Sequence, residues 1–106
     1  MDEAVARTLD RASLVKRLRE LKPEFRKAGV TRLAIFGSRA RGDNRPDSDV
    51  DVLIDVDPDR KFSLFDLVGV SHLIQDHLGL ENHVEMRRSL EEAFAREIEP
   101  DVVEIF

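Results

Sequence analysis

The sequence contains no cysteine, which excludes a disulfide framework and a thiolate metal site, and nothing in it argues for secretion. It also lacks an apolar run long enough to span a membrane. Its opening residues, MDEAVARTLD, have no apolar core of the kind found in signal peptides. We therefore expect a cytoplasmic protein that does not contact a membrane.

Positive charge is scarce: 17 Lys and Arg residues face 22 Asp and Glu residues, for a formal net charge of -5. Proteins that hold nucleic acid neutralise its phosphates with clustered Lys and Arg. A broad basic face is therefore unlikely to exist here, and we expect no direct binding of nucleic acid. Local binding of a small anion remains compatible with this charge.

The length of 106 residues, 42% of them hydrophobic, is that of one domain with one core, and we predict a single domain over residues 1–106. Apolar residues at helical spacing predict a largely helical segment over residues 1–28, in which Pro23 kinks the helix or opens a second short turn. Further helices are predicted from the capping pair Ser63 and Asp66 to Gly79, and from Ser89 and Glu92 to Pro100.

Strands are predicted over residues 32–36, 49–56, 83–87 and 102–106, which carry short apolar or alternating patterns. Together the elements predict an α/β (α+β) fold, in which helices flank a small mixed β-sheet. Phe62, Phe65 and Phe94 are interpreted as core residues rather than as a platform for stacking bases.

The stretch FGSRARGDNRPDSDVDVLIDV, residues 36–56, places many carboxylates on an apolar strand. Successive strand side chains point to opposite faces, so Asp49 and Asp51 share one face, about 6.5 to 7 Å apart. Two carboxylates held in this way suit Mg²⁺, which takes one or two protein carboxylates and completes its coordination with water and phosphate oxygens. Asp55 lies on the same face but further along a twisting strand, and is a weaker candidate for the same ion.

Gly37 and Ser38 stand at the end of the first predicted strand, where Arg39 to Arg41 are predicted to begin a short helix capped by Ser38. Glycine allows a phosphate to approach the backbone, the hydroxyl adds a hydrogen bond, and a helix start favours negative charge. The sequence therefore predicts a polyphosphate seat here, to which Arg39 and Arg41 add positive charge.

Gly37-Ser38, ten residues, and then Asp49-Val50-Asp51 resembles the G-S-x10-D-x-D signature of the DNA polymerase β-like nucleotidyltransferase superfamily. The longer string GSRARGDNRPDSDVDVLIDV is similar to the minimal nucleotidyltransferase (MNT) domains, which are antitoxins of HEPN/MNT toxin–antitoxin modules. The likeness extends over most of the chain, from LKPEFRKAGVTRLAIFGS to HVEMRRSL.

This resemblance implies transfer of AMP from ATP to a hydroxyl group with loss of pyrophosphate. In MNT antitoxins the acceptor is a tyrosine of the partner HEPN toxin, which the modification inactivates. Carried over by position, Gly37 and Ser38 hold the triphosphate, and Asp49 and Asp51 bind Mg²⁺, with two ions expected. Two such ions stabilise the attacking and departing oxygens of an in-line displacement.

The third carboxylate of the family is usually an aspartate, where this sequence has Glu85. Glu85 lies on the strand face opposite Val84 and Met86, so it is a candidate metal ligand or proton acceptor. Its extra methylene shifts the carboxylate by about one carbon–carbon bond, and misplacements of about 1 Å in an active site can cost on the order of 100-fold in rate.

Two hypotheses therefore stand side by side. The first is a Mg²⁺-dependent protein adenylyltransferase, and the second is an antitoxin that neutralises its partner by stoichiometric binding without catalysis. In either case the small size of the chain suggests a homo-oligomer or a hetero-oligomer with the toxin, in which another subunit supplies part of the acceptor site.

Overall fold

The computed structural model describes residues 9–106, so part of the first predicted helix lies outside the described residues. The rest of that segment forms two helices, α2 (Arg11–Glu20) and α3 (Lys22–Lys27). The Asp10 side chain caps α2 by accepting a hydrogen bond from the Ser13 backbone N–H at 2.8 Å. Pro23 stands in the first turn of α3, so the prediction that it opens a second short helical segment is confirmed.

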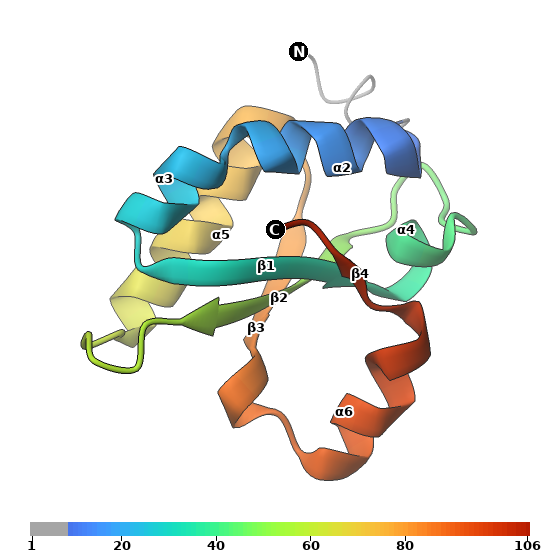
Figure 1. Cartoon of the computed structure of the whole chain (residues 1–106). Coiled ribbons are helices and arrows are strands. Elements are labelled where there is room, and N and C mark those ends of the chain that lie inside the picture. The colour runs from blue at the N-terminus through green and yellow to red at the C-terminus, as the bar shows by residue number, and fades with distance from the viewer. Residues whose placement is uncertain (1–8) are drawn as a thin grey trace.

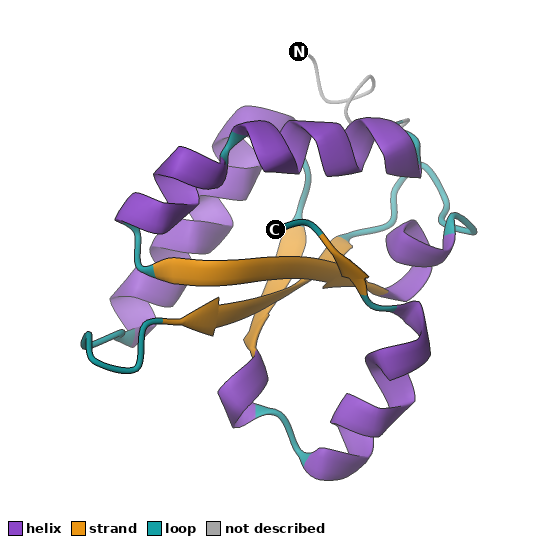
Figure 2. Cartoon of the chain, in the orientation of Figure 1, coloured by secondary structure: helices purple, strands orange, loops and turns teal. Residues whose placement is uncertain are grey.

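Four strands form one mixed sheet in the order β3-β2-β1-β4, namely β1 (Val30–Phe36), β2 (Val50–Val56), β3 (Asn82–Met86) and β4 (Val103–Glu104). β1 pairs antiparallel with β2 and β4, whereas β2 and β3 run parallel. The predicted mixed sheet flanked by helices is thus confirmed, although the last strand is shorter than the sequence suggested (Figures 1 and 2).

The two faces of the sheet are covered differently. α2, α3 and α5 (Leu64–Leu78) lie over one face and bury the main core, which contains Leu14, Leu18, Phe25, Leu33, Ile35, Val52, Ile54 and Ile74 (Figure 1). α6 (Glu92–Ile98) lies under the other face, where a smaller apolar cluster contains Ala34, Phe36, Leu53 and Ile98. The second face is the one on which the acidic residues of β2 stand, because they alternate with the buried valines.

α5 begins and ends where the sequence predicted. Ser63 and Asp66 form the capping box: the Ser63 backbone N–H donates to the Asp66 carboxylate at 2.8 Å, and the Ser63 hydroxyl accepts from the Asp66 N–H at 3.3 Å. These hydrogen bonds lower the pKa of Asp66. Gly79 ends the helix in the left-handed conformation, with φ of 67°.

Two predicted helix caps are wrong. The short helix α4 (Gly37–Arg41) begins two residues earlier than expected, with Phe36 at its N-cap position, so Ser38 lies inside its first turn and no side chain caps it. α6 follows a 3-10 turn that takes up Ser89, so Glu91 stands at its N-cap position. α4 instead starts directly after the last residue of β1, and the 3-10 turn before α6 moves the start of that helix to Glu92.

The interpretation of the phenylalanines also needs correction. Phe62 packs partly buried against the main core. Phe65, however, is 88% exposed on α5 beside the exposed Leu64, and Phe94 is 38% exposed on α6. None of the helices within residues 9–106 combines the length and the apolar character that crossing a membrane requires.

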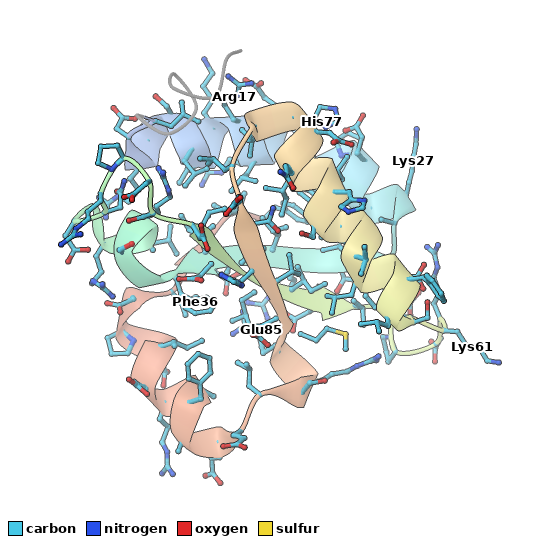
Figure 3. The ribbon with its side chains drawn as sticks, turned by 180° about the vertical axis from the view of Figure 1, so that it is seen from behind. Arg17, Lys27, Phe36, Lys61, His77 and Glu85 are labelled. Carbon is cyan, nitrogen blue, oxygen red and sulfur yellow. The ribbon has the colours of Figure 1, made fainter. Side chains whose placement is uncertain are left out.

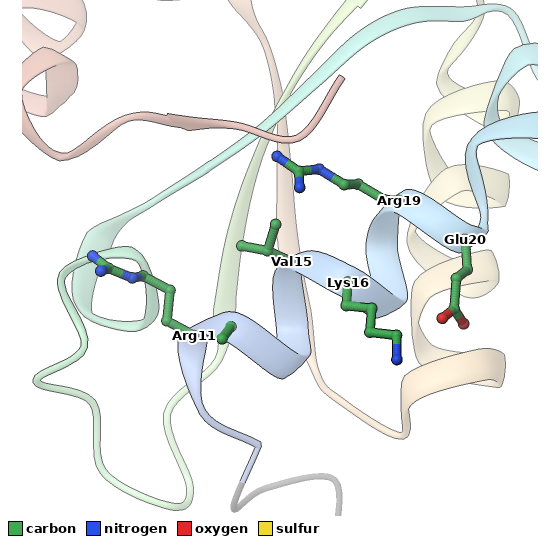
Figure 4. Close-up of a pocket in the computed structure, with 6 residues that line it drawn as sticks. Arg11, Val15, Lys16, Arg19 and Glu20 are labelled. Atoms are coloured by element: carbon green, nitrogen blue, oxygen red, sulfur yellow. The ribbon is translucent and has the colours of Figure 1, made fainter.

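Side chains from α2 fasten this helix to distant parts of the chain. Arg19 donates to the Ile105 carbonyl at 3.0 Å, and Arg11 donates to the Ala40 carbonyl at 3.2 Å. Both arginines line a hollow of about 570 Å³ along the helix, together with Val15, Lys16 and Glu20 (Figure 4). None of the predicted site residues lines this hollow, so its basic side chains serve here to hold α2 in place.

Candidate functional site

The end of β1 brings the backbone of Gly37 against the side chain of Asp51. Phe36 pairs with Asp51 across the β1–β2 ladder, and Gly37 follows with φ of 74°, in the left-handed region that favours glycine. A Cβ atom at Gly37 would collide with the Asp51 carboxylate oxygen Oδ2. The glycine is therefore required both by its backbone conformation and by this close approach, which places the first motif directly beside the second.

We expect Gly37→Ala to bind its ligand more weakly because of this collision, and to be less stable because of the positive φ. A positive φ costs a residue with a side chain roughly 1–3 kcal/mol, and the Cβ atom would also displace the Asp51 carboxylate. We expect Mg²⁺-dependent binding of the ATP analogue AMP-PNP, measured by calorimetry, to fall by at least about tenfold. Gly42→Ala is the matched control, because Gly42 has a similar φ of 84° but no atom near its Cβ position. Equal binding loss in both variants would contradict the role given to the Asp51 contact.

Asp49 immediately precedes β2, and Asp51 lies within it. Their contacts with His83 on β3 show how the two side chains lie relative to each other. The Asp49 carboxylate lies 2.8 Å from Nε2 of His83, and His83 pairs with Asp51 in the β2–β3 ladder. Residues paired in a ladder project to the same face. Asp49, Asp51 and His83 therefore form one polar group at the start of β2.

Asp51 carries an unfavourable charge in this environment. Burial is the main cause that raises its pKa, the carboxylates of Asp49 and Glu85 raise it further, and His83 and Arg41 act in the opposite direction. A cation beside Asp51 would relieve both the desolvation and the repulsion. The donor set thus suits a hard cation such as Mg²⁺, which is satisfied by two protein carboxylates. Among residues 9–106, however, no three His, Asp or Glu side chains are grouped so as to form a metal site by themselves.

Glu85 lies one ladder position beyond Asp51, since it pairs with Leu53 while His83 pairs with Asp51. It lines the same pocket as Gly37, Asp51 and His83, with a volume of about 320 Å³. In Figure 3 the strand β3 lies toward the viewer, and the labels mark Glu85 on β3 and Phe36 at the end of β1. The structure thus brings Glu85 into the pocket that Asp51 lines, whereas Asp49 is not among the residues of that pocket. Within residues 9–106, Glu85 does not join the two aspartates in one cluster of ligands.

Arg39 was predicted to contact a phosphate group, but in the structure its side chain contacts backbone carbonyls. Its side chain is 1% exposed, and its guanidinium donates to the carbonyls of Ser48 at 2.8 Å, Pro46 at 3.2 Å and Leu9 at 3.4 Å. Burial lowers its pKa, and the nearby Asp49 carboxylate counteracts this shift. Arg39 therefore holds the loop that leads to Asp49, rather than offering its charge to a ligand.

Arg41 lines the pocket of Asp51 and Glu85, as a nucleotide-binding residue would. Its guanidinium makes ion pairs with Asp43 at 3.1 Å and Asp101 at 2.9 Å, and hydrogen bonds to both carboxylates raise its pKa. Asp101 also lines the pocket. An incoming phosphate would compete with these two acids for Arg41.

Asp55, the weaker metal candidate, is engaged elsewhere. Its carboxylate pairs with Arg87 at 3.2 Å and Arg32 at 3.5 Å, and both arginines also contact Glu104. This network ties the ends of β1, β2 and β4 to the turn after β3. Asp55 is therefore part of the support of the sheet, away from the pocket.

Sequence reasoning missed several residues of the pocket. His83 stands two positions before Glu85, so the alternation of strand faces could have found it. Asp101 and Phe94 gave no comparable signal, because they reach the pocket only through the packing of α6 and the 3-10 turn that follows it.

Comparison with known proteins agrees with this geometry. The model of the nucleotidyltransferase domain matches residues 14–105. The chain is 33% identical over 85 residues to the protein adenylyltransferase MntA of Thermococcus cleftensis, covering 80% of this chain and 81% of that protein.

Solved structures share the fold. One assigned as a minimal nucleotidyltransferase superposes with a TM-score of 0.76 at 25% identity, covering 91% of this chain and 96% of the other. A toxin–antitoxin structure with AMP-PNP has a TM-score of 0.69 at 13% identity, covering 85% of this chain and 72% of the other, and indicates likeness of fold alone.

Fold and pocket thus define an enzyme of the nucleotidyl-transferring class, in which a glycine approaches the carboxylate of Asp51 on the central strand β2. The chain belongs to the nucleotidyltransferase domain family.

Proposed function

We propose that this protein is a Mg²⁺-dependent adenylyltransferase that transfers AMP from ATP to a hydroxyl group of a partner toxin and thereby neutralises it. The observation that carries the proposal is the contact of the Gly37 backbone with Asp51, in a pocket that Glu85 also lines. The curated relative from Thermococcus cleftensis, itself a protein adenylyltransferase, supports the choice of AMP and of a protein acceptor.

In this proposal Gly37 and Ser38 hold the triphosphate at the end of β1, and Arg41 adds a positive charge. Asp49 and Asp51 would hold Mg²⁺, and Glu85, which lines the pocket with Asp51, would be the candidate ligand of a second ion. Bound Mg²⁺ supplies positive charge that neutralises the phosphate oxygens and the developing charge of the reaction. His83 contacts the Asp49 carboxylate through the single oxygen Oδ2.

The reaction balances with the groups of the pocket. The acceptor oxygen forms a bond to the α-phosphorus of ATP, and the bond from that phosphorus to the bridging oxygen breaks. Pyrophosphate leaves with the bonding electron pair, and Glu85 accepts the proton of the acceptor hydroxyl. The rigid strands β2 and β3 contribute by positioning these groups.

The proposed acceptor is a tyrosine of a HEPN-domain toxin, and the proposed assembly is a complex of the two chains. A solved relative of the fold is a toxin–antitoxin complex of MntA with its partner, which supports a toxin as the partner of this chain. The acidic pocket agrees with a protein acceptor, because its acids would repel a polyanionic one such as nucleic acid.

A second candidate function is neutralisation of the toxin by stoichiometric binding. The observation that favours it is that, among the described residues, Glu85 does not join Asp49 and Asp51 in a group of three metal ligands. In that case the fold would serve as a binding module and the carboxylates would be dispensable.

The deciding experiment is intact-mass spectrometry of the candidate toxin after incubation with this protein, ATP and Mg²⁺. We expect a mass gain of one or more AMP units with the wild type and none with the Asp49→Ala/Asp51→Ala variant. Toxin neutralisation should fail with the same variant while the complex still forms. Neutralisation that survives in the variant, without any mass gain in the wild-type reaction, would replace the enzymatic account by the binding module.

A further inference from the structure

One wall of the pocket is apolar and has no part in binding metal or phosphate. It consists of Phe94 and Ile98 on α6 and Phe36 at the end of β1, and the same pocket is lined by the carboxylates of Asp51 and Glu85. The Phe36 and Phe94 rings meet edge to face, with centroids 6.1 Å apart and an interplanar angle of 81°. Phe36 is buried, so it fixes the orientation of Phe94, whose ring stays 38% exposed.

We propose that Phe94 is the residue that selects an aromatic hydroxyl as acceptor, by packing against the acceptor ring inside the pocket. This inference rests on the proposed function and adds to it the residue that distinguishes a phenol from an aliphatic alcohol. A partly exposed aromatic ring beside Phe36 and Ile98, in a pocket that also holds Asp51 and Glu85, suits a ligand that offers both a ring and a hydroxyl group.

The position of Phe94 favours the acceptor ring over the base of the nucleotide. The acceptor oxygen must reach about 3 to 3.5 Å from the α-phosphorus, so a phenol ring joined directly to it lies close to the reacting atoms. The base of ATP is separated from the same phosphorus by a whole ribose. A pocket of about 320 Å³ that contains Asp51, Glu85 and Phe94 together therefore fits the shorter reach of the phenol.

The acids of the pocket disfavour the triphosphate beside the apolar wall, whereas Arg41 of the same pocket favours it near α4. Glu97 lines the pocket on the same helix as Phe94, and Glu85 lines it from β3. These acids repel phosphate oxygens but leave a neutral ring unaffected. A phenol can therefore use the apolar wall while its hydroxyl points toward Glu85.

The test compares two small acceptors, N-acetyltyrosinamide and N-acetylserinamide, with the full-length protein, ATP and Mg²⁺. Phe94→Ala is expected to raise KM for the tyrosine compound by about tenfold, consistent with loss of a ring contact and the area it buries, and to change kcat little. KM for ATP should stay within about twofold. Phe94→Leu should recover part of the loss, because leucine restores apolar volume without a ring.

Phe65→Ala is the matched control, since Phe65 is an exposed phenylalanine on α5 that does not line the pocket. It should leave every constant unchanged. If Phe94→Ala binds ATP more weakly but binds the tyrosine compound as well as the wild type does, the inference is overturned. The apolar wall would then contact the adenine base of ATP. Equal use of both acceptors by the wild type would also overturn the inference.

Saturation-transfer NMR with the tyrosine compound and AMP-PNP separates this inference from the proposed function. One outcome is that the tyrosine ring binds to the wild type and binds more weakly to Phe94→Ala, while no acceptor receives AMP. This outcome would support the role of Phe94 and contradict the proposed reaction. If the wild type transfers AMP and Phe94→Ala transfers it equally well, the role of Phe94 is contradicted and the proposed function is not. Failure of the wild type to bind the tyrosine compound would also contradict the role of Phe94.

Discussion

Asp51→Asn should abolish AMP transfer and, at the same time, make the protein more stable at neutral pH. In the proposed reaction Asp51 is a ligand of Mg²⁺, and its loss would remove several kcal/mol of charge stabilisation, so we expect transfer to fall roughly 100-fold or more. Stability should rise because the ionised Asp51 is partly desolvated and stands near two other carboxylates, which raises its pKa. The amide removes that charge and keeps the shape of the side chain.

The gain in stability should depend on pH in a defined direction. The folded protein binds a proton at Asp51 more readily than the unfolded chain does, because the folded pKa lies above the ordinary value of 3.8. The wild type is therefore penalised most above the folded pKa, and the penalty fades as the pH falls toward 3.8. The Tm difference between variant and wild type, measured by calorimetry, should be largest near pH 7 and shrink toward pH 4.

Asp55→Asn is the control on the same strand face. Asp55 pairs with Arg87 and Arg32 outside the pocket, so its amide variant should keep transfer activity and lose stability rather than gain it. If Asp51→Asn proved less stable than the wild type at pH 7, the account of a strained carboxylate at this position would be wrong.

Arg39→Met is the substitution for which we expect the largest loss of stability. Arg39 is buried and donates hydrogen bonds to the carbonyls of Ser48, Pro46 and Leu9, and methionine would leave these acceptors without that donor. Because hydrogen bonds from charged groups contribute about 1.5–3 kcal/mol each and are not additive, we expect a loss of about 2–4 kcal/mol in the free energy of unfolding. Urea denaturation followed by circular dichroism measures it.

The same substitution should impair the site indirectly. The loop held by Arg39 leads straight to Asp49, so its release should weaken Mg²⁺-dependent binding of AMP-PNP at temperatures where the variant is still folded. Arg39→Lys should rescue little, because lysine lacks the planar fork that reaches several carbonyls at once. Arg45→Met, an exposed arginine of the same loop, should stay within about 0.5 kcal/mol of the wild type. A small effect of Arg39→Met on stability would return Arg39 to the role of a ligand contact.

The sequence alone was sufficient wherever a feature depends on neighbours along the chain. The capping box of Ser63 and Asp66, the stop at Gly79 and the second helical segment at Pro23 follow from backbone chemistry within a few residues, and all three were predicted correctly. The spacing from Gly37 to Asp51 likewise indicated the nucleotidyltransferase family before any fold was known. The cap assigned to Ser38 was wrong because α4 already begins at Gly37, and the cap assigned to Ser89 was wrong because a 3-10 turn takes up that residue.

Only the tertiary structure decided which charged groups are available to a ligand. Arg39 and Arg41 are equivalent in the sequence, yet packing buries the first against loop carbonyls and leaves the second in the pocket. Phe94 reads as a core residue from its helical spacing, but α6 covers the catalytic face incompletely and exposes its ring. The sequence by itself determined the family, and it predicts the pair of aspartates as the site, because both depend on local spacing. The tertiary structure decided the walls of the pocket, because residues far apart in the chain meet there only after folding.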